Sequence, residues 1–106
     1  MTEPIDLDKE SILAEAERLV TGDRDKDYGH PYFNFGRIAL MWSAILDREV
    51  TRQEVALCMI ALKVARQVHA PKRDNLVDIC GYVKTLELIQ EKGWERLEQA
   101  LQDEKE

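Results

Sequence analysis

Four charged side chains occupy positions from which they could bind an anionic or a metal-bound ligand. Asp74 and Asp78 are four residues apart, a spacing that puts two carboxylates on one face of a helix. Lys63 and Arg66 are long bases on one side of an otherwise apolar helical segment. Like charges repel unless an opposite charge lies between them. We therefore predict a site in which the acids bind a divalent cation and the bases bind an anion such as phosphate.

Simpler explanations of the same residues stay open. The bases could reach solvent along the helix surface, Asp74 could be a helix N-cap, and Asp78 could be a solvated surface acid. The four residues could also form an internal salt-bridge network between two helices. Gly81 favours a ligand over these explanations. A glycine inside a helix costs about 1 kcal/mol relative to alanine, and close approach of a ligand to the backbone would be a reason to keep it there.

The segment GDRDKDYGHPYFNF, residues 22–35, combines charges, a histidine and aromatic side chains. We expect a charged loop here, followed by a rigid corner at residues 28–31 that leads into a helix. His30 could carry a proton or donate to an anion near neutral pH, or it could be a loop histidine with ordinary hydrogen bonds. Tyr28, His30 and Asn34 are predicted to form a lid over an anionic, planar ligand.

Apolar residues recur at helical spacing through most of the chain, and strand patterns are nearly absent. Thr51 and Glu54 form the Thr-x-x-Glu pattern of a capping box, so we expect Glu54 to be structural and not catalytic. The prediction is a single all-α domain, residues 1–106, built as a four-helix bundle with its core at residues 8–92 and a tail at residues 93–106. The predicted helices are Leu7–Val20 (ended by Thr21-Gly22), Tyr32–Leu46, Thr51–His69, Asp74–Lys92 (ended by Gly93) and a short charged helix from Trp94 to Lys105.

Charge and hydropathy exclude several classes of protein. The net charge is −6 and the bases are scattered, so we expect no nucleic-acid partner. The longest apolar run, Val55–Leu62, is far short of a membrane span, so we expect no membrane partner. The acidic N-terminus lacks the apolar region of a signal peptide. These features predict a cytoplasmic protein, in the host cytoplasm if a phage encodes it.

Two cysteines and the apolar helices bear on packing and assembly. Cys58 and Cys80 lie inside apolar helical patterns, so we interpret both as small core residues and not as metal or redox groups. The segment around Cys58 is apolar on all sides, and Tyr32–Leu46 is apolar on two faces. A chain of 106 residues has few layers to cover these surfaces, so we predict a homo-oligomer.

Three segments, GDRDKDYGHPYFNFGRIALMW, EVALCMIALKVARQ and DNLVDICGY, resemble a family of small phage and prophage proteins of unassigned function. In order and spacing they also resemble the nucleotide-modification-associated domain, which is remotely linked to the MazG-like all-α NTP pyrophosphatases. The similarity covers residues from about Ile12 to Ile89. It implies a MazG-like all-α fold and a phage protein of nucleotide metabolism.

In the MazG-like superfamily, an acidic Glu-Glu-x-x-Glu helix and a later Glu-x-x-Asp pair bind magnesium, which holds the triphosphate and activates water. The resemblance implies that Asp74 and Asp78 correspond to the later pair. The acidic helix is missing, since the matching segment Glu54–Arg66 has Lys63 and Arg66 at its polar positions. A nucleotide pyrophosphohydrolase would therefore lack half of its metal ligands here. Binding without hydrolysis and action on a monophosphate both stay open.

Two functions from different classes follow. The first is a nucleotide-binding or nucleotide-metabolism protein of phage type, with magnesium as its cofactor. The acids Asp74 and Asp78 would then bind the metal or a nucleotide hydroxyl, and the bases Lys63 and Arg66 would bind phosphate. The predicted lid residues would cover the nucleotide or contact its base. The alternative is a non-enzymatic, oligomeric helical interaction protein, for example a phage modulator of a host protein, in which the bases and acids link two helices. A nucleotide screen separates the two, because only the first predicts that a nucleotide stabilises the fold.

Overall fold

The computed structural model describes residues 9–91 and 94–105, and every regular element in these ranges is helical. The predicted all-α class is therefore confirmed. The predicted helix start at Leu7, and Lys92 and Gly93 at another predicted helix end, lie outside the described residues. The elements are α1 (Ile12–Arg18), the π-helical η1 (Leu19–Asp23), α2 (Arg24–Tyr28), α3 (Pro31–Leu46), α4 (Arg52–His69), α5 (Arg73–Ile89) and α6 (Trp94–Lys105).

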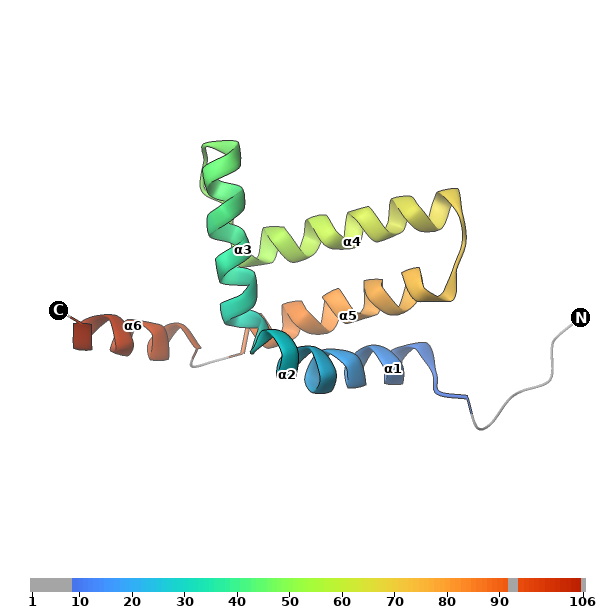
Figure 1. Ribbon diagram of the computed structural model, residues 1–106, viewed down its shortest axis with the longest axis horizontal. Helices are drawn as coiled ribbons and strands as arrows, with labels where there is room; N and C mark the ends of the chain where they lie inside the picture. The colour runs from blue at the N-terminus through green and yellow to red at the C-terminus, as the bar shows by residue number, and fades with distance from the viewer. Residues whose placement is uncertain (1–8, 92–93, 106) are drawn as a thin grey trace, which may run out of the picture.

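Three helices lie side by side in a layer, and a fourth crosses the end of it (Figure 1). Helix α5 lies between α1 and α4 and contacts both, and α3 crosses this layer where α4 begins. Helix α6 extends away from the other helices beyond α3. The helices of this single chain are thus arranged mainly as neighbours in a layer, and the predicted four-helix bundle is not confirmed.

The N-terminal helical segment is longer than the sequence predicts. Helical structure continues from α1 through η1 and α2 as far as Tyr28. The prediction that Thr21-Gly22 ends the helix is therefore wrong, as is the prediction of a charged loop over the following residues. A glycine ends a helix when it takes a left-handed conformation. In this segment that glycine is Gly29, whose φ is 80°.

The π-helical turn η1 brings Val20 against α5. Val20 is buried, and its Cγ2 lies 3.4 Å from the position that a Cβ atom at Gly81 would take. A π-turn holds more residues than an α-helical turn, so it changes the register of the side chains around it. Gly81 therefore faces the N-terminal segment of the same chain, which corrects its interpretation as a point where a ligand approaches.

Capping fixes the starts of α3 and α4. His30 is the N-cap of α3: its Nδ1 accepts a hydrogen bond from the N–H of Tyr32 at 3.1 Å, and Pro31 takes the first helical position. The predicted capping box of α4 is confirmed. Thr51 Oγ1 accepts from the N–H of Glu54, and Glu54 Oε1 accepts from the N–H of Thr51, both at 3.1 Å.

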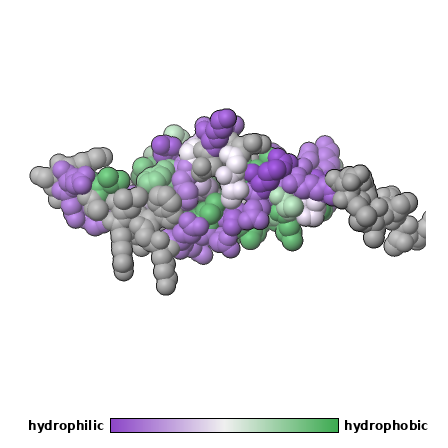
Figure 2. Space-filling view, turned by 90° about the horizontal axis from the view of Figure 1, so that it is seen from below, coloured by the Kyte–Doolittle hydropathy of each residue, from purple (hydrophilic) through white to green (hydrophobic). Residues whose placement is uncertain are grey.

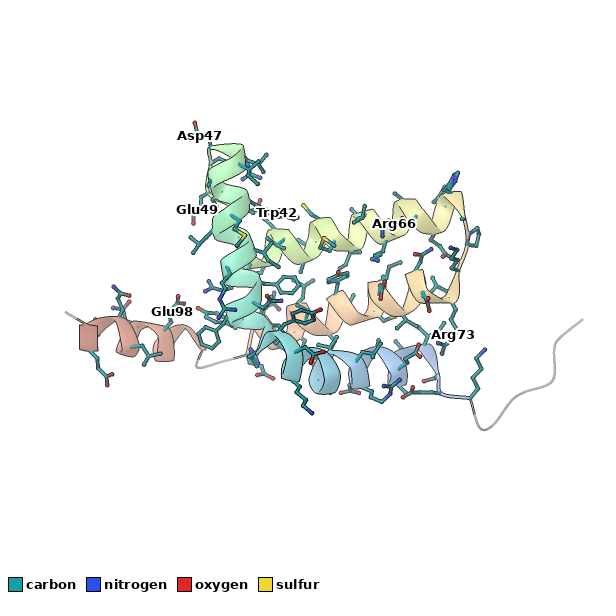
Figure 3. The ribbon with its side chains drawn as sticks, in the orientation of Figure 1. Trp42, Asp47, Glu49, Arg66, Arg73 and Glu98 are labelled. Atoms are coloured by element: carbon teal, nitrogen blue, oxygen red, sulfur yellow. The ribbon has the colours of Figure 1, made fainter. Side chains whose placement is uncertain are left out.

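The start of α5 is attached to α1. Helix α5 begins at Arg73, and its N-cap is Lys72, so the proposed N-cap role of Asp74 is wrong. Arg73 donates from Nη1 to Glu15 Oε2 at 2.5 Å and from Nη2 to the carbonyl of Glu10 at 2.8 Å. Figure 3 shows Arg73 between the first turns of α5 and α1. These contacts hold the two helices side by side at this end of the layer.

The core lies where α3 crosses α4 and α5. The buried side chains that pack together are Tyr32, Phe35, Ala39, Val50, Val55, Ala56 and Ile89.

The interpretation of both cysteines as core residues fails for Cys58, which is exposed, whereas Cys80 is half-buried. Because α4 is at the edge of the layer, only part of its circumference contacts other helices.

Much of the apolar surface lies on α3 and α4. The edge formed by α1 and α2, which faces the viewer in Figure 2, is mainly hydrophilic with isolated apolar side chains. Within the described part of the chain, none of the helices has the length and hydropathy needed to cross a bilayer. The large apolar side chains exposed on α3 and α4 are Leu40, Met41, Ile45, Leu46, Leu57, Leu62, Val64 and Val68.

Candidate functional site

One of the predicted bases meets one of the predicted acids between α4 and α5. Lys63 Nζ lies 2.8 Å from Asp78 Oδ2, and the two side chains are only 15% and 21% exposed. A charge-assisted contact that is shielded from water is stronger than a surface ion pair. The predicted salt-bridge contact between these two helices is confirmed for Lys63 and Asp78.

Arg66 and Asp74 lie in a different environment, because both are exposed. Arg66, labelled in Figure 3, lies on α4 three residues beyond Lys63. Asp74 lies in the first turn of α5. The predicted contact is not confirmed for Arg66 and Asp74. An acid in the first turn of a helix stabilises that helix through the macrodipole, so Asp74 has an ordinary structural role.

A cavity of about 420 Å³ opens between η1, α2, α3, α4 and α5. Its size lies within the range of small-molecule sites, which are mostly apolar with a few polar groups. Aromatic rings stack on planar heterocycles, and a carboxamide can both donate and accept hydrogen bonds. The cavity is therefore suited to a flat heteroaromatic ring. The side chains in its wall that could recognise such a ring are Tyr28, Phe35, Trp42, Tyr82, Asn34 and Thr85.

The Lys63–Asp78 pair lies close to this cavity along the two helices. Met59, on α4, and Tyr82, on α5, both line the cavity. Lys63 follows Met59 by four residues, and Asp78 precedes Tyr82 by four residues. Because residues four apart share a face of a helix, the ion pair lies one helical turn beyond the wall of the cavity.

The residues predicted to form a lid are divided by the structure. Tyr28 and Asn34 line the cavity, and Tyr28 is 62% exposed, as a residue at the mouth would be. The imidazole of His30 caps α3 and lies outside the cavity wall. The arrangement thus brings two of the three predicted residues to one site, and it favours the structural interpretation of His30.

Sequence reasoning missed most of the aromatic wall. Phe35 and Trp42 belong to the apolar stripe of α3, and such a stripe predicts core packing as well as it predicts a cavity. Trp42 lies on the side of α3 that faces α4 (Figure 3). Thr85 is buried and shares a helix face with Asp78 and Gly81. That shared face was the only signal that could have linked Thr85 to the site.

A second polar cluster surrounds Arg52, to which the sequence pattern assigns no role. Arg52 Nε donates to the carbonyl of Tyr32 at 2.7 Å, and its guanidinium lies 3.9 Å from the centroid of the Tyr32 ring. Arg52 Nη2 is 3.4 Å from Glu98 Oε1 on α6, and Glu98 also accepts a hydrogen bond from the Tyr32 hydroxyl. Figure 3 shows Glu98 on α6. The cluster therefore connects α6 to α3 and α4.

The contact of Asp78 with Lys63 weighs against a magnesium ion at the predicted metal site. Magnesium needs an octahedral set of oxygen ligands, usually with one or two carboxylates. Among residues 9–91 and 94–105, no three or more His, Cys, Asp or Glu side chains are grouped so that they could hold a metal. Asp78 contacts Lys63, whose positive charge disfavours a cation at the same carboxylate.

The fold and the site define a small all-helical protein with an aromatic-walled cavity beside a partly buried acid–base pair. The profile of the domain of unknown function DUF6378 matches residues 11–90. This match covers most of the chain, so the chain belongs to the DUF6378 family.

Two curated relatives are phage proteins. The Gene 55 protein of Mycobacterium phage D29 is 46% identical over 83 residues, which are 77% of this chain and 55% of the relative. The Gene 55 protein of Mycobacterium phage L5 is 43% identical over 82 residues, which are 76% of this chain and 53% of the relative. The chain therefore spans about half the length of these relatives. No solved structure matches the chain. The predicted resemblance to phage proteins is confirmed, and the link to MazG-like pyrophosphatases stays a hypothesis.

Proposed function

We propose that this protein binds a nucleotide, with the heterocyclic base in the aromatic cavity and the phosphate directed toward Lys63. The observation that carries the proposal is the position of the cavity, one helical turn from the Lys63–Asp78 pair. Stacking of a base on aromatic side chains contributes about 1–3 kcal/mol. The carboxamide of Asn34 in the cavity wall supplies a donor and an acceptor for the edge of the base.

The acid–base pair gives the polar half of the ligand its binding groups. Asp78 holds the ammonium group of Lys63 at 2.8 Å, so the lysine side chain is already positioned before a ligand arrives. A ligand phosphate would share that ammonium group, and Asp78 would accept a hydrogen bond from a sugar hydroxyl. Arg66, with a long and permanently charged side chain, suits a further contact to phosphate.

The proposal is for binding, and it assigns no catalytic residue. Pyrophosphohydrolase activity of the MazG-like type would need metal-binding acids that the residues around the cavity do not supply. Because two curated relatives are phage proteins, we place the proposed nucleotide binding in a phage context. We therefore expect the nucleotide to bind without magnesium.

A thermal-denaturation screen of the full chain tests this function. The ligands are nucleosides, nucleoside monophosphates and nucleoside triphosphates, each with and without magnesium. A ligand at 100 times its Kd adds about 2.7 kcal/mol to the free energy of unfolding, which raises Tm measurably. We expect a nucleoside to raise Tm, its phosphates to raise it further, and magnesium to leave both shifts unchanged. A screen in which every ligand leaves Tm unchanged would contradict the proposal.

Two lysine variants separate the phosphate contact from general effects of charge. Lys84 lies on α5, is 24% exposed and pairs with Glu17 and Glu87, so Lys84→Met is a matched control for Lys63→Met. Lys63→Met should keep the Tm shift caused by the nucleoside and lose the additional shift caused by phosphate. Lys84→Met should keep both. A full phosphate increment in Lys63→Met would remove Lys63 from the site.

Variants of the cavity wall test the position of the nucleotide's heterocyclic base. Tyr82→Leu removes a stacking surface and should lose the shift caused by the nucleoside. Trp42 provides a direct signal, because a base beside its ring quenches indole fluorescence. Quenching by a nucleoside should disappear in Trp42→Phe. Quenching that persists in Trp42→Phe would place the base elsewhere.

The alternative function is a non-enzymatic interaction protein that binds a host protein. The Lys63–Asp78 contact favours this alternative, because the pair can link α4 to α5 without any ligand. The apolar side chains exposed on α3 and α4 also favour it. A nucleotide screen without Tm shifts would support this alternative.

A further inference from the structure

Two hydrogen-bond donors at the crossing of α3 and α4 point to one carboxylate, that of Glu98 on α6. The Tyr32 hydroxyl donates to Glu98, and Nη2 of Arg52 lies 3.4 Å from Glu98 Oε1. A guanidinium and a phenol hydroxyl together supply the donors that a carboxylate accepts. The Arg52 guanidinium and the Tyr32 hydroxyl are called the carboxylate clamp below.

The two donors of the clamp are held in place by contacts that do not involve α6. Nε of Arg52 donates to the carbonyl of Tyr32, and the guanidinium lies over the Tyr32 ring. Gly36 has no side chain to fill the space that the guanidinium occupies. The Tyr32 side chain is buried in the core. Groups that are already ordered lose little entropy when a ligand binds, so the clamp is built independently of its occupant.

The occupant of the clamp is held less firmly than the clamp itself. Glu98 belongs to a helix that extends away from the other helices (Figure 1), and its side chain is 49% exposed. Exposed ion pairs of this kind contribute little to stability. Among the α6 side chains that the structure describes, only that of Glu98 forms hydrogen bonds or ion pairs with another helix. The carboxylate in the clamp is therefore exchangeable.

A cavity of about 480 Å³ opens beside the clamp, and Glu98 forms part of its wall. Among the other described residues of the wall, Arg37 and Arg52 carry guanidinium groups and Glu49 carries a carboxylate. Without Glu98 this wall has an excess of one positive charge, in a chain whose net charge is −6. A cavity that is positive within an acidic chain favours an anionic ligand.

Apolar side chains in the same wall restrict the kind of anion. Phe33 and Leu40 line the cavity, and Leu40 is 74% exposed. A ligand that carries an apolar side chain beside its carboxylate would cover this apolar surface as well as fill the clamp. A segment of an acidic helix has this chemistry. The α6 sequence has it too, since Glu98 follows Leu97 directly.

We propose that the carboxylate clamp is a binding site for an acidic helical segment of a partner protein, and that Glu98 is an internal occupant which the partner displaces. Helix α6 then acts as a latch on the site. A segment tethered by a short linker competes at an effective concentration in the millimolar range. The inference does not depend on the proposed nucleotide, because the clamp lies outside the aromatic cavity.

Nuclear magnetic resonance of the ¹⁵N-labelled full chain tests the proposal, with the Nε–H of Arg52 and the backbone N–H of Gly36 as reporters. The probe is a synthetic peptide with the sequence of residues 94–105, since this sequence contains the carboxylate that occupies the clamp. Glu98→Gln removes the charge of the internal occupant. Asp103→Asn is the matched control, because it removes one charge from α6 at a side chain that accepts from Gln99 of the same helix.

The peptide should bind the Glu98→Gln protein at least ten times more tightly than it binds the wild type or Asp103→Asn, because only that variant frees the clamp. A second peptide that itself carries Glu98→Gln should bind the Glu98→Gln protein at least ten times more weakly than the first peptide. Tyr32→Phe, combined with Glu98→Gln in the protein, keeps the aromatic ring and removes one donor, so it should also weaken binding of the first peptide.

Three results would overturn the proposal. They are equal affinity of the first peptide for the wild type and for Glu98→Gln, equal affinity of the two peptides, and no shift of either reporter in Glu98→Gln at millimolar peptide. Light scattering of the same samples distinguishes a different occupant. A wild type of twice the mass of 12.3 kDa that becomes monomeric in Glu98→Gln would show that α6 of a second copy fills the clamp, and it would overturn the internal latch.

Discussion

The guanidinium of Arg52 lies in the space that a Cβ atom at Gly36 would need. Such an atom would be 2.7 Å from Nη2 and 2.9 Å from Nε of Arg52. The guanidinium is held there by the carbonyl and the ring of Tyr32, at 2.7 Å from the oxygen and 3.9 Å from the ring centroid. This close approach of α3 and α4 fixes the angle at which α3 crosses the layer.

Replacement of Gly36 by alanine should therefore destabilise the fold. The new methyl group displaces the guanidinium of Arg52 from Tyr32, and the loss of a charge-assisted hydrogen bond outweighs the gain of about 1 kcal/mol in helix propensity. We expect Gly36→Ala to lower the free energy of unfolding by about 1–2 kcal/mol in urea titrations. Gly81→Ala is the control, because its Cβ would meet Val20 at an ordinary contact distance of 3.4 Å. That variant should be neutral or more stable, and an equal loss in both variants would refute the explanation.

The Lys63–Asp78 pair should couple strongly in a double-mutant cycle. Asp78→Asn removes the carboxylate that pairs with Lys63, whose side chain is only 15% exposed, so we expect the free energy of unfolding to fall by about 1–3 kcal/mol. The additional change Lys63→Met should recover part of that loss. Urea titrations of the four proteins measure the coupling. Lys84 and Glu87 form the control pair and should couple weakly, since Glu87 is 68% exposed. Additive effects of Lys63→Met and Asp78→Asn would show that the contact contributes nothing.

The capping box of α4 should make stability depend on pH. The hydrogen bond that the Glu54 carboxylate accepts from the backbone N–H of Thr51 lowers the pKa of Glu54 below the ordinary value of 4.5, and the contact with Arg48 lowers it further. Because the pKa is lower in the folded state, the carboxylate stabilises the fold above pH 4.5. That contribution is lost as the pH falls through the folded-state pKa.

Glu54→Gln tests this dependence, because glutamine can still accept the hydrogen bond from Thr51 but does not titrate. The Tm of the wild type should exceed that of Glu54→Gln at neutral pH, and the difference should vanish in acid. Glu49→Gln controls for the loss of one negative charge at this end of α4 and should keep the wild-type pH profile. A difference between wild type and Glu54→Gln that stays constant with pH would contradict the assignment. Binding of a nucleotide should survive in Glu54→Gln, since the cap lies outside the cavity.

The boundaries of α3 and α4 could be predicted from the sequence because local interactions set them. Pro31 suits the first turn of a helix, and Thr51 with Glu54 satisfies the free N–H groups at the start of α4. The error at Gly22 has the same origin. A glycine ends a helix only if the chain turns left-handed there, and packing of Val20 on Gly81 instead carries the helical segment on to Gly29.

Most contacts over longer distances were decided only by the tertiary structure, and the Lys63–Asp78 pair is an exception. The spacing of charges was sufficient to predict that Lys63 would meet an acid on the next helix, since two helices joined by a short turn must pack side by side. The cavity was not predictable, because an apolar stripe has the same periodicity whether its side chains fill the core or surround a space. The exposure of Cys58 was not predictable from the sequence for the same reason. Periodicity shows which residues share a face of a helix, and only the packing of one helix on another determines whether that face is buried, lines a cavity or is left at the surface.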